Sequence, residues 1–433
     1  MGFFARRFRR FMNLGTVLGG AITRNVLRGV FKILIAGVLG PAALGVVRSI
    51  YSLFRIVTRL TDLGLDYAAV TLCSAALARD NAEESRRTFG TILTLKLVIG
   101  LGVLVIGNAL AAQVTPWLLG DPRLETFARL AFLAVGGQLL WKYMHSHFWA
   151  HRRFRSVALF LTTVPLLMLA VFGVLRPLGL FSIDVAALLY LFAPAVTVAL
   201  WWFLAGRDLV RVPTWSRAVA GNIIRFSRWI YASSMVSATR ADLNPLLLKN
   251  PSLSGSIAAG EVATGLYGFG ADLASEITLF SQSLTTVLLP EASAKRSPES
   301  LLRFVKRAYL HLVPLLIPLV LLVFAAEPLI LLLAWVKESY LEFLPAAAAF
   351  KPLFLAGLVS VATIPIQTAL YAARLPHMET YVELGTVVIL IGGSLWLIPL
   401  YGSVGAALAV LAQRTTAGVI LVVWGIARLR RMP

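Results

Sequence analysis

The sequence of 433 residues is poor in cysteine and in charged side chains. Its one cysteine, Cys73, excludes a disulfide within the chain and any metal cluster built from cysteines. Only 14% of the residues are charged, against about 25% in an average globular chain. The sequence contains no G-x-x-x-x-G-K-[ST] phosphate loop, which argues against ATP hydrolysis by the chain itself. We therefore expect a protein outside the soluble class, without cofactor or metal site and without enzyme activity.

Hydrophobic residues make up 58% of the chain, and the mean hydropathy is +0.81. A membrane-spanning helix needs about 20 mostly apolar residues, and such stretches recur along nearly the whole chain. They predict an all-α polytopic membrane protein with about twelve transmembrane helices. The predicted spans are 14–38, 42–64, 89–112, 123–147, 157–175, 183–206, 226–248, 258–290, 305–325, 343–372, 380–399 and 402–427.

Basic residues concentrate in alternate connections between these spans, for example Arg86 and Arg87, then Arg152 and Arg153. The N-terminus is a basic aromatic segment that leads into a full span, and we expect no cleavable signal peptide. By the positive-inside rule both termini face the cytoplasm, which requires an even number of spans. The same arrangement accounts for the net charge of +20 without nucleic acid as a partner.

The chain also repeats itself weakly, at an offset of about 220 residues. The segment 43–46 opens the second predicted span much as 264–267 opens the eighth, and 185–188 recurs as 405–408. Six spans return the chain to the same side of the membrane, so the halves are predicted to be parallel repeats around a central cavity. The predicted domains are an N-terminal lobe over 1–206, a basic cytoplasmic linker over 207–225 and a C-terminal lobe over 226–433.

Basic residues also occur inside the first two predicted spans, where each would cost about 2.5–3.5 kcal/mol if it faced lipid. Within each helix they share one face, and the antiparallel course of the two helices places them at matching depths. We therefore predict a cationic ladder that binds a phosphate or an acidic sugar. For Arg24 and Arg59 the alternative is that the side chain reaches the interface. The predicted substrate-binding residues are Arg24, Arg28, Lys32, Arg48, Arg55, Arg59 and, in the seventh span, Arg240.

Acidic residues mark the second half in the same way. Glu261, Asp272 and Glu276 share one face of the eighth span, and Asp242 follows shortly after Arg240. Burial raises the pKa of a carboxyl group, so these four residues are candidates for carrying a coupling ion. The alternative, which the sequence leaves open, is that they form internal salt bridges with the basic ladder.

Two segments and the twelve-span plan together resemble one known group. The segments are Leu39-Gly40-Pro41-Ala42-Ala43-Leu44-Gly45 and Leu60-Thr61-Asp62-Leu63-Gly64-Leu65. This group is the polysaccharide-transporter branch of the multidrug, oligosaccharidyl-lipid and polysaccharide exporter superfamily. The resemblance implies a flippase that moves polyprenyl-diphosphate-linked sugar units, of O-antigen, exopolysaccharide or capsule, across the bacterial inner membrane by alternating access. The implied partners are that glycolipid, membrane lipids, and a polysaccharide polymerase or other assembly proteins.

Two alternatives stay open at the level of the sequence. A cation-coupled multidrug exporter would share the architecture, but a positive cavity would reject cationic drugs. A membrane glycosyltransferase or polysaccharide polymerase would need sizeable external loops, and the outward connections predicted here reach only about fifteen residues. Both alternatives therefore rank below the flippase.

Overall fold

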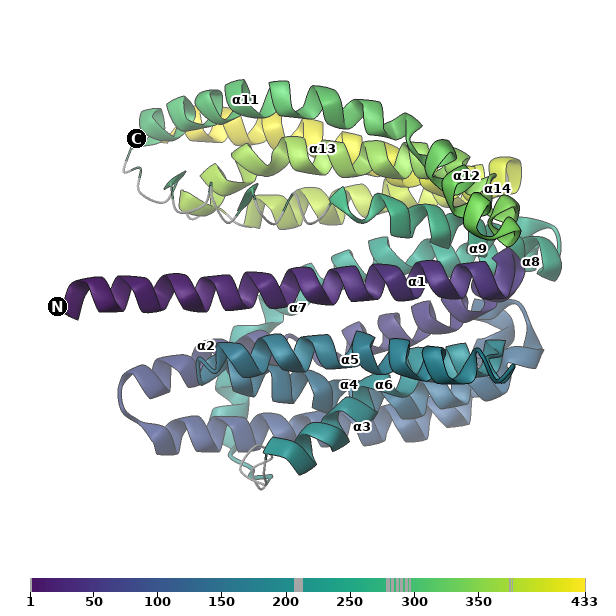
Figure 1. The fold of residues 1–433 in the computed structure, drawn as a ribbon. Helices are drawn as coiled ribbons and strands as arrows, with labels where there is room; N and C mark the ends of the chain where they lie inside the picture. Colours follow the sequence, from purple (N-terminus) through teal and green to yellow (C-terminus); the bar gives the residue numbers. More distant parts are fainter. Residues whose placement is uncertain are drawn as a thin grey trace. The chain divides into compact units, whose positions relative to one another are not determined.

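The computed structural model describes residues 2–205, 213–277, 297–373, 375 and 377–432, and positions 281, 284, 285, 288, 291, 292 and 295. It describes the backbone alone for residues 2–18, 78, 205, 228–230, 232–234 and 236–241. Within these residues the chain is helical and has no strand (Figure 1), which confirms the predicted all-α class. The helices are α1 (Gly2–Asp62), α2 (Leu65–Ala78), α3 (Ala82–Leu119), α4 (Glu125–Ala150), α5 (Phe154–Leu175), α6 (Ile183–Ala205), α7 (Arg217–Lys249), α8 (Pro251–Ser254), α9 (Ile257–Ala274), α11 (Pro298–Leu321), α12 (Ala326–Val336), α13 (Ala346–Ala372) and α14 (His377–Arg430), with short 3-10 turns η1 (Pro122–Leu124), η3 (Leu322–Phe324) and η4 (Glu338–Phe343).

Among the described residues, seven helices are long and apolar enough to cross a membrane. Two of them each contain two predicted spans, because the backbone turns at a glycine inside the helix. In α1 the turn is at Gly40, with φ 73°, and in α14 it is at Gly402, with φ 55°. Both angles lie in the left-handed region that glycine adopts without a steric penalty. The remaining three predicted spans fall on α4, α7 and α9, and the end of 258–290 lies outside the described residues.

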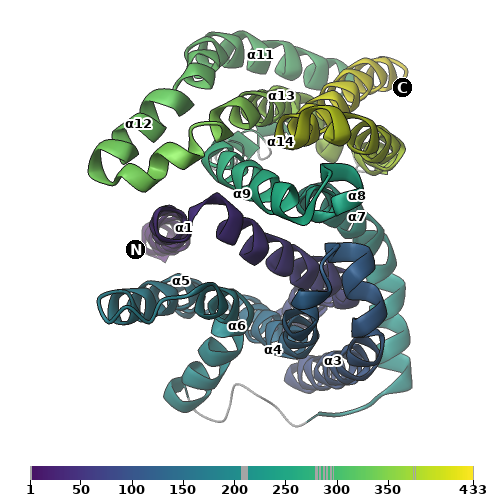
Figure 2. The same cartoon turned by 90° about the vertical axis from the view of Figure 1, so that its right-hand side faces the viewer.

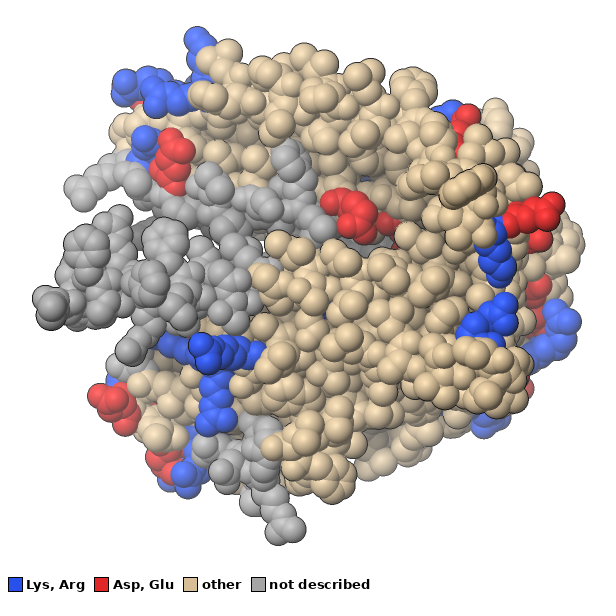
Figure 3. Space-filling view, viewed as in Figure 1, with Lys and Arg blue, Asp and Glu red and all other residues tan. Residues whose placement is uncertain are grey.

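Charged side chains lie mostly near the ends of the helices. In the face shown in Figure 3, most Lys, Arg, Asp and Glu side chains lie towards the two ends of the helices, and the part between them is uncharged apart from an acidic group near the centre of the view. Large apolar side chains are exposed in the middle parts of helices, for example Leu101 of α3 at 62% and Val388 of α14 at 71%. An exposed apolar surface of this kind is expected where lipid takes the place of water. The protein is therefore a multi-pass membrane protein.

The helix ends show why the connections are short. Asn81 caps α3 by accepting the amide of Glu84 at 3.0 Å, and Ser256 caps α9 by accepting the amide of Ala259 at 3.1 Å. Ser297 and Ser300 form a reciprocal capping box at the start of α11. Each cap satisfies backbone donors that the first turn of a helix leaves free. Polar residues outside the apolar runs thus end the helices without long loops.

The helices form two compact units. Unit 1 comprises residues 1–35 and 49–238, and unit 2 comprises residues 36–48 and 239–433. In unit 1, α3 packs on α4 and α4 on α6; in unit 2, α13 packs on α14 and α9 (Figures 1 and 2). The units differ from the predicted lobes at 36–48 and 226–238, so the lobe boundaries stay a prediction. The predicted linker lies partly outside the described residues, and its end, from Arg217 onward, belongs to α7.

Candidate functional site

Unit 1 encloses a cavity of about 280 Å³ between both parts of α1 and helices α4, α5 and α6. This volume is just below the usual range of small-molecule pockets, about 300–1,000 Å³. Its lining combines two arginines and an amide with aromatic and aliphatic side chains. The lining residues are Arg24, Arg28, Phe31, Tyr51, Phe54, Gln138, Trp141, Leu161, Val164, Pro165, Met168, Tyr190 and Pro194.

Helical spacing explains why these residues face one space. Arg24, Arg28 and Phe31 are separated by four and three residues, so they lie on one side of the first part of α1. The same spacing holds for Leu161, Val164, Pro165 and Met168 on α5 and for Tyr190 and Pro194 on α6. Each helix therefore contributes one stripe, and the arginines are part of the stripe on α1.

The cavity is positively charged. Neither Arg24 nor Arg28 forms an ion pair with any residue that the structure describes, and no carboxylate lines the cavity. The Nε of Arg24 donates to Oδ1 of Asn25, the next residue in the helix, at 3.3 Å. Two arginines without an acid inside a membrane helix would cost about 5–7 kcal/mol if they faced lipid. The cavity gives them instead an environment that water or an anion can enter.

Aromatic rings form one wall of the cavity. The rings of Tyr51 and Tyr190 lie 4.7 Å apart, and Phe31 meets Tyr190 edge-on at 5.7 Å. The guanidinium of Arg55 lies 5.5 Å from the centre of the Tyr51 ring, within the range of a cation–π contact. Trp141 stacks on Phe160 at 5.3 Å, and its Nε1 is a buried donor without a hydrogen-bond partner among the described residues. Flat apolar faces with polar edges thus lie beside the two arginines.

Other cations of unit 1 are neutralised by acids. Lys96 is 2.8 Å from Asp62 and 2.9 Å from Asp66, and Lys142 is 3.4 Å from both carboxylates. We call Asp62, Asp66, Lys96 and Lys142 the four-charge cluster; it joins α1, α2, α3 and α4. The Lys96 side chain is only 1% exposed. The acids nearest in sequence to the predicted ladder are therefore engaged by these lysines.

The structure places the predicted basic residues in different surroundings. Arg24 and Arg28 line the cavity, whereas Lys32, Arg55 and Arg59 belong to the same unit without lining it. The segment that contains Arg48 belongs to unit 2, where Arg48 forms an ion pair with Asp272. The side chain of the last candidate, Arg240, lies outside the described residues. The six-charge ladder thus stays a prediction, of which the structure brings two arginines together in one cavity.

Two of the predicted acidic residues are ion-paired in unit 2. Lys249 contacts Glu261 at 2.6 Å, and Asp272 pairs with Arg48. This second pair is of the kind that the alternative hypothesis expected, between an acid of the second half and a base of the predicted ladder. Asp242 is buried at 1% exposure, and Glu276 is exposed just beyond the end of α9. A role of these acids in ion coupling stays a prediction.

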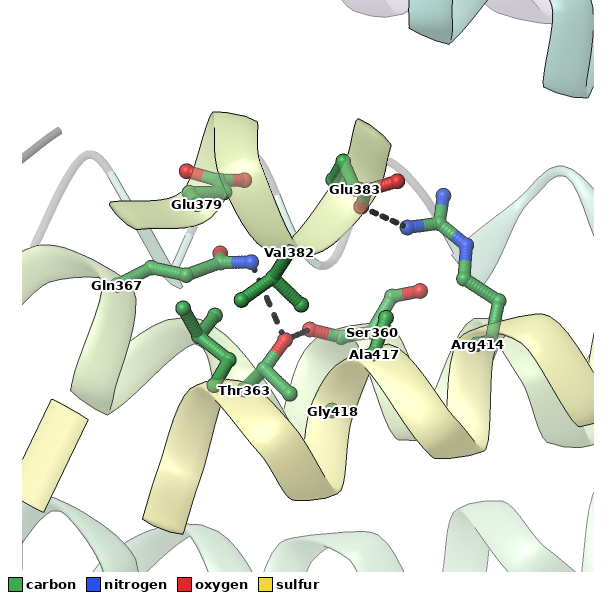
Figure 4. A pocket seen from close by; sticks show the side chains of 10 residues that line it. Ser360, Thr363, Gln367, Glu379, Val382, Glu383, Arg414, Ala417 and Gly418 are labelled. Carbon is green, nitrogen blue, oxygen red and sulfur yellow. Dashed lines mark hydrogen bonds and ion pairs between the residues drawn. The ribbon is translucent and has the colours of Figure 1, made fainter. Parts of the chain in front are cut away.

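Unit 2 has a small polar pocket of about 10 Å³ between α13 and α14, a volume that accommodates about one water molecule. Glu383 and Arg414, from two parts of α14, meet at 3.1 Å beside it (Figure 4). Thr363 and Gln367 of α13 lie across the pocket and are hydrogen-bonded to each other at 3.3 Å. This pocket is too small for a lipid head group, and its arginine is already paired.

Several residues of the cavity were missed by sequence reasoning. The aromatic and amide side chains Tyr51, Gln138, Trp141 and Tyr190 carry no signal that separates them from lipid-facing or interfacial residues. Lys96 could have been found, because a lysine inside the third predicted span raises the same energetic question as Arg28. The partners of Asp62 and Asp66 would then have been sought on that span.

Comparisons with known proteins agree with this architecture. A family model described as "Polysaccharide biosynthesis protein" matches residues 9–340. The chain is similar to a MATE-family multidrug resistance transporter solved in an inward-facing conformation, with TM-score 0.74 and 15% identity over 94% of both chains. It is also similar to an exporter-superfamily transporter from Pyrococcus furiosus with a binding pocket described as having reverse polarity, with TM-score 0.59 and 13% identity over 97% of this chain and 95% of that one. The fold is that of the multidrug, oligosaccharidyl-lipid and polysaccharide exporter superfamily, as the sequence resemblance predicted. Among curated proteins, none matches the chain.

Proposed function

The chain belongs to the family of polysaccharide biosynthesis proteins, and on this premise we propose that it is a bacterial inner-membrane flippase for a polyprenyl-diphosphate-linked oligosaccharide. The observation that carries the proposal is the cavity of unit 1, whose lining has two arginines and, among the described residues, no carboxylate. A guanidinium binds phosphate oxygens through two parallel hydrogen bonds. Arg24 and Arg28 lie one helical turn apart, and this pair of guanidinium groups suits a diphosphate better than it suits an anion with a single charge.

The aromatic wall supports a sugar as the second part of the substrate. Sugar rings have apolar C–H faces and a polar rim, so they pack on flat rings whose edges carry hydrogen-bonding groups. Tyr51, Tyr190 and Trp141 provide such surfaces in the same cavity as the arginines. A cavity of about 280 Å³ suits the diphosphate and the sugar attached to it, while the rest of the glycan and the polyprenyl chain extend beyond it.

The sign of the charge disfavours a cation-coupled multidrug exporter. A cavity with two arginines repels cationic drugs, and its described lining offers no carboxylate to hold them. For the Pyrococcus furiosus transporter, reverse polarity of the binding pocket is reported to suggest a different function. Pocket polarity is thus a property that varies among proteins with this fold, and here it favours an anion.

The proposal is tested by reconstituting the protein in liposomes with a fluorescent polyprenyl-diphosphate sugar and measuring how much label becomes accessible in the opposite leaflet. We expect wild-type protein to move the lipid and the Arg24→Ala/Arg28→Ala variant to lose at least about 100-fold in rate, since hydrogen bonds to charged groups contribute about 1.5–3 kcal/mol each. Arg24→Lys/Arg28→Lys keeps the charge without the bidentate geometry and is expected to retain intermediate activity.

Arg129→Ala is the matched control, because Arg129 lies on cavity helix α4 but pairs with Glu125 at 2.7 Å and does not line the cavity. Its transport rate is expected to equal that of wild type. Release of free sugar without movement of the lipid would indicate an enzyme instead. Equal rates in the double-alanine variant and wild type would refute the assigned site.

A further inference from the structure

A histidine extends the cavity-lining face of α4 towards the four-charge cluster. Gln138 and Trp141 of α4 line the cavity of unit 1, and His145 follows Trp141 by one helical turn on the same face. The rings of Trp141 and His145 lie parallel, with 5.7 Å between their centres and 6° between their planes. His145 is outside the lining itself. It therefore lies directly behind one of the rings that form the wall of the cavity.

The structure leaves the protonation state of His145 open to its surroundings. Its Nε2 atom is buried and has no hydrogen-bond partner among the described residues. A neutral imidazole has one donor and one acceptor nitrogen, whereas in the protonated ring both nitrogens are donors. The ring is held between indoles, since it also meets Trp149 edge-on at 5.3 Å. Stacking on the rings thus positions the imidazole, and no hydrogen bond at Nε2 commits it to one form.

Charged groups surround this imidazole from three helices. Asp66 of α2, Arg24 of α1 and Lys142 of α4 interact with it electrostatically. Asp66 is already engaged by Lys142 and by Lys96 of α3, whereas Arg24 lines the cavity. The ring therefore lies between the four-charge cluster and the cavity. A proton bound to it while the cavity holds no anion would add a further positive charge near Arg24 and Lys142.

An anion in the cavity reverses this balance. Opposite charges attract over several ångströms in surroundings poor in water, so a diphosphate beside Arg24 favours a protonated imidazole nearby. The indole of Trp141 favours the same form, because a cation within about 6 Å of the centre of a tryptophan ring is attracted by its face. The protonated ring would then have the indole and the anion as favourable neighbours.

We propose that His145 binds a proton together with the anion that enters the cavity of unit 1. The proposal rests on the proposed function for the identity of that anion. By linkage, the anion strengthens proton binding by the same factor by which the proton strengthens anion binding. His145 is a positioning residue, since it acts through the electric field in the cavity and through Trp141 without touching the anion. Each diphosphate thus enters the cavity with one proton.

The first test measures binding of a short-chain prenyl-diphosphate sugar to the full chain in detergent, from about pH 6 to about pH 8.5. The diphosphate of this probe is esterified at both ends and keeps its charge over this range. We expect the Kd of wild type to rise about fivefold for each pH unit, within the limit of about tenfold that one linked proton sets. In His145→Gln the Kd is expected to change by less than about twofold over the whole range.

The shape of the pH profile separates linkage from a structural role. The affinities of wild type and His145→Gln are expected to converge at about pH 8.5, where the wild-type ring is neutral with and without the anion. A purely structural role would lower the affinity of the variant by the same factor at every pH. His151→Gln is the matched control, because His151 ends the same helix but packs on Phe89 at 5.7 Å. It is expected to keep the wild-type slope.

A second measurement counts protons directly and needs no variant. Binding is carried out in weakly buffered solution at about pH 7 with a pH indicator, where we expect wild type to take up close to one proton per bound anion. Sulfate serves as a second probe, since its charge does not change in this range and it carries neither sugar nor lipid. His145→Gln is expected to take up almost none with either probe.

The outcomes separate this proposal from the proposed function. A wild-type protein that takes up no proton with either probe overturns the proton site, and so does a pH slope that survives in His145→Gln or disappears only in His151→Gln. If wild type binds no prenyl-diphosphate sugar but takes up a proton with sulfate, and His145→Gln abolishes this uptake, the substrate assignment fails and the proton site stands.

Discussion

The two units handle charges inside their helices in different ways. In unit 2, Arg48 pairs with Asp272, Lys249 with Glu261 and Arg414 with Glu383. In unit 1, the four-charge cluster is balanced in the same way, but the cavity-lining Arg24 and Arg28 form no ion pair with any described residue. Placing a charge away from water is costly in both units. In the paired charges, a charged partner within the protein offsets that cost. For the cavity arginines, water or an anion that enters the cavity has to offset it.

The comparison predicts that removing a paired charge destabilises the protein. Lys96→Met leaves two carboxylates with Lys142 alone, and we expect a loss of about 3–5 kcal/mol in the free energy of unfolding, the usual cost of removing one partner of a buried pair. Denaturant unfolding in detergent measures it. Adding Asp62→Asn to Lys96→Met is expected to recover part of the loss. Arg87→Ala, which breaks an exposed pair with Glu83, is the control and is expected to change stability by less than about 1 kcal/mol.

The same experiment in unit 2 gives a smaller effect. Lys249→Met leaves Glu261 without its lysine, and because the Glu261 side chain is 18% exposed, we expect a loss of about 2–3 kcal/mol. Thermal unfolding in detergent reports the change, and Lys249→Met/Glu261→Gln is expected to recover most of it. If the Lys249→Met protein were as stable as wild type, the ion pairs of unit 2 would not offset the free-energy cost of burying their charged groups.

Removing a cavity arginine is expected to act in the opposite direction. Arg28→Leu deletes a charge without an ion-pair partner among the described residues, so the free energy of unfolding should rise by about 1 kcal/mol, a fraction of the insertion cost of an arginine. Lipid flipping is expected to fall at the same time. Unfolding and flipping are measured on one preparation. If Arg28→Leu destabilised the protein instead, Arg28 would behave like the paired charges, and the contrast between the cavity arginines and the paired charges would be refuted.

The smallest effect is expected from adding an acid to the cavity. Gln138→Glu places a carboxylate in the lining that contains Arg24 and Arg28, and it competes there with the phosphates of the substrate. We expect about fourfold weaker binding of a polyprenyl-diphosphate sugar, which corresponds to about 0.8 kcal/mol. Titration by intrinsic tryptophan fluorescence measures it, with Gln138→Leu to separate charge from loss of the amide. Unchanged binding in Gln138→Glu would place the substrate elsewhere.

The sequence predicted the helices well for a physical reason. A bilayer demands runs of about 20 apolar residues with internally bonded backbone, and this demand is visible in composition alone. The backbone leaves helical geometry at Gly40 and at Gly402, so α1 and α14 each consist of two helical segments, one for each of two predicted spans.

The candidate site was predicted only in part. The cost of burying charge identified Arg24 and Arg28, because that cost depends on residue type and on position along a span. It did not identify their neighbours Tyr51, Trp141 and Tyr190, since an aromatic residue in a membrane helix is compatible with lipid, interface or cavity alike. The pairing of Asp62 and Asp66 with Lys96 and Lys142 joins four helices and has no sequence signature.

The sequence by itself thus determined that the chain spans the membrane as helices and that some of its basic residues need a partner other than lipid. Which basic residues have such a partner was decided only by the tertiary structure. Arg28 and Arg48 look alike in the sequence, since each lies inside an apolar helix. One lines a cavity and the other meets Asp272, because charge compensation acts over a few ångströms between helices that are far apart along the chain.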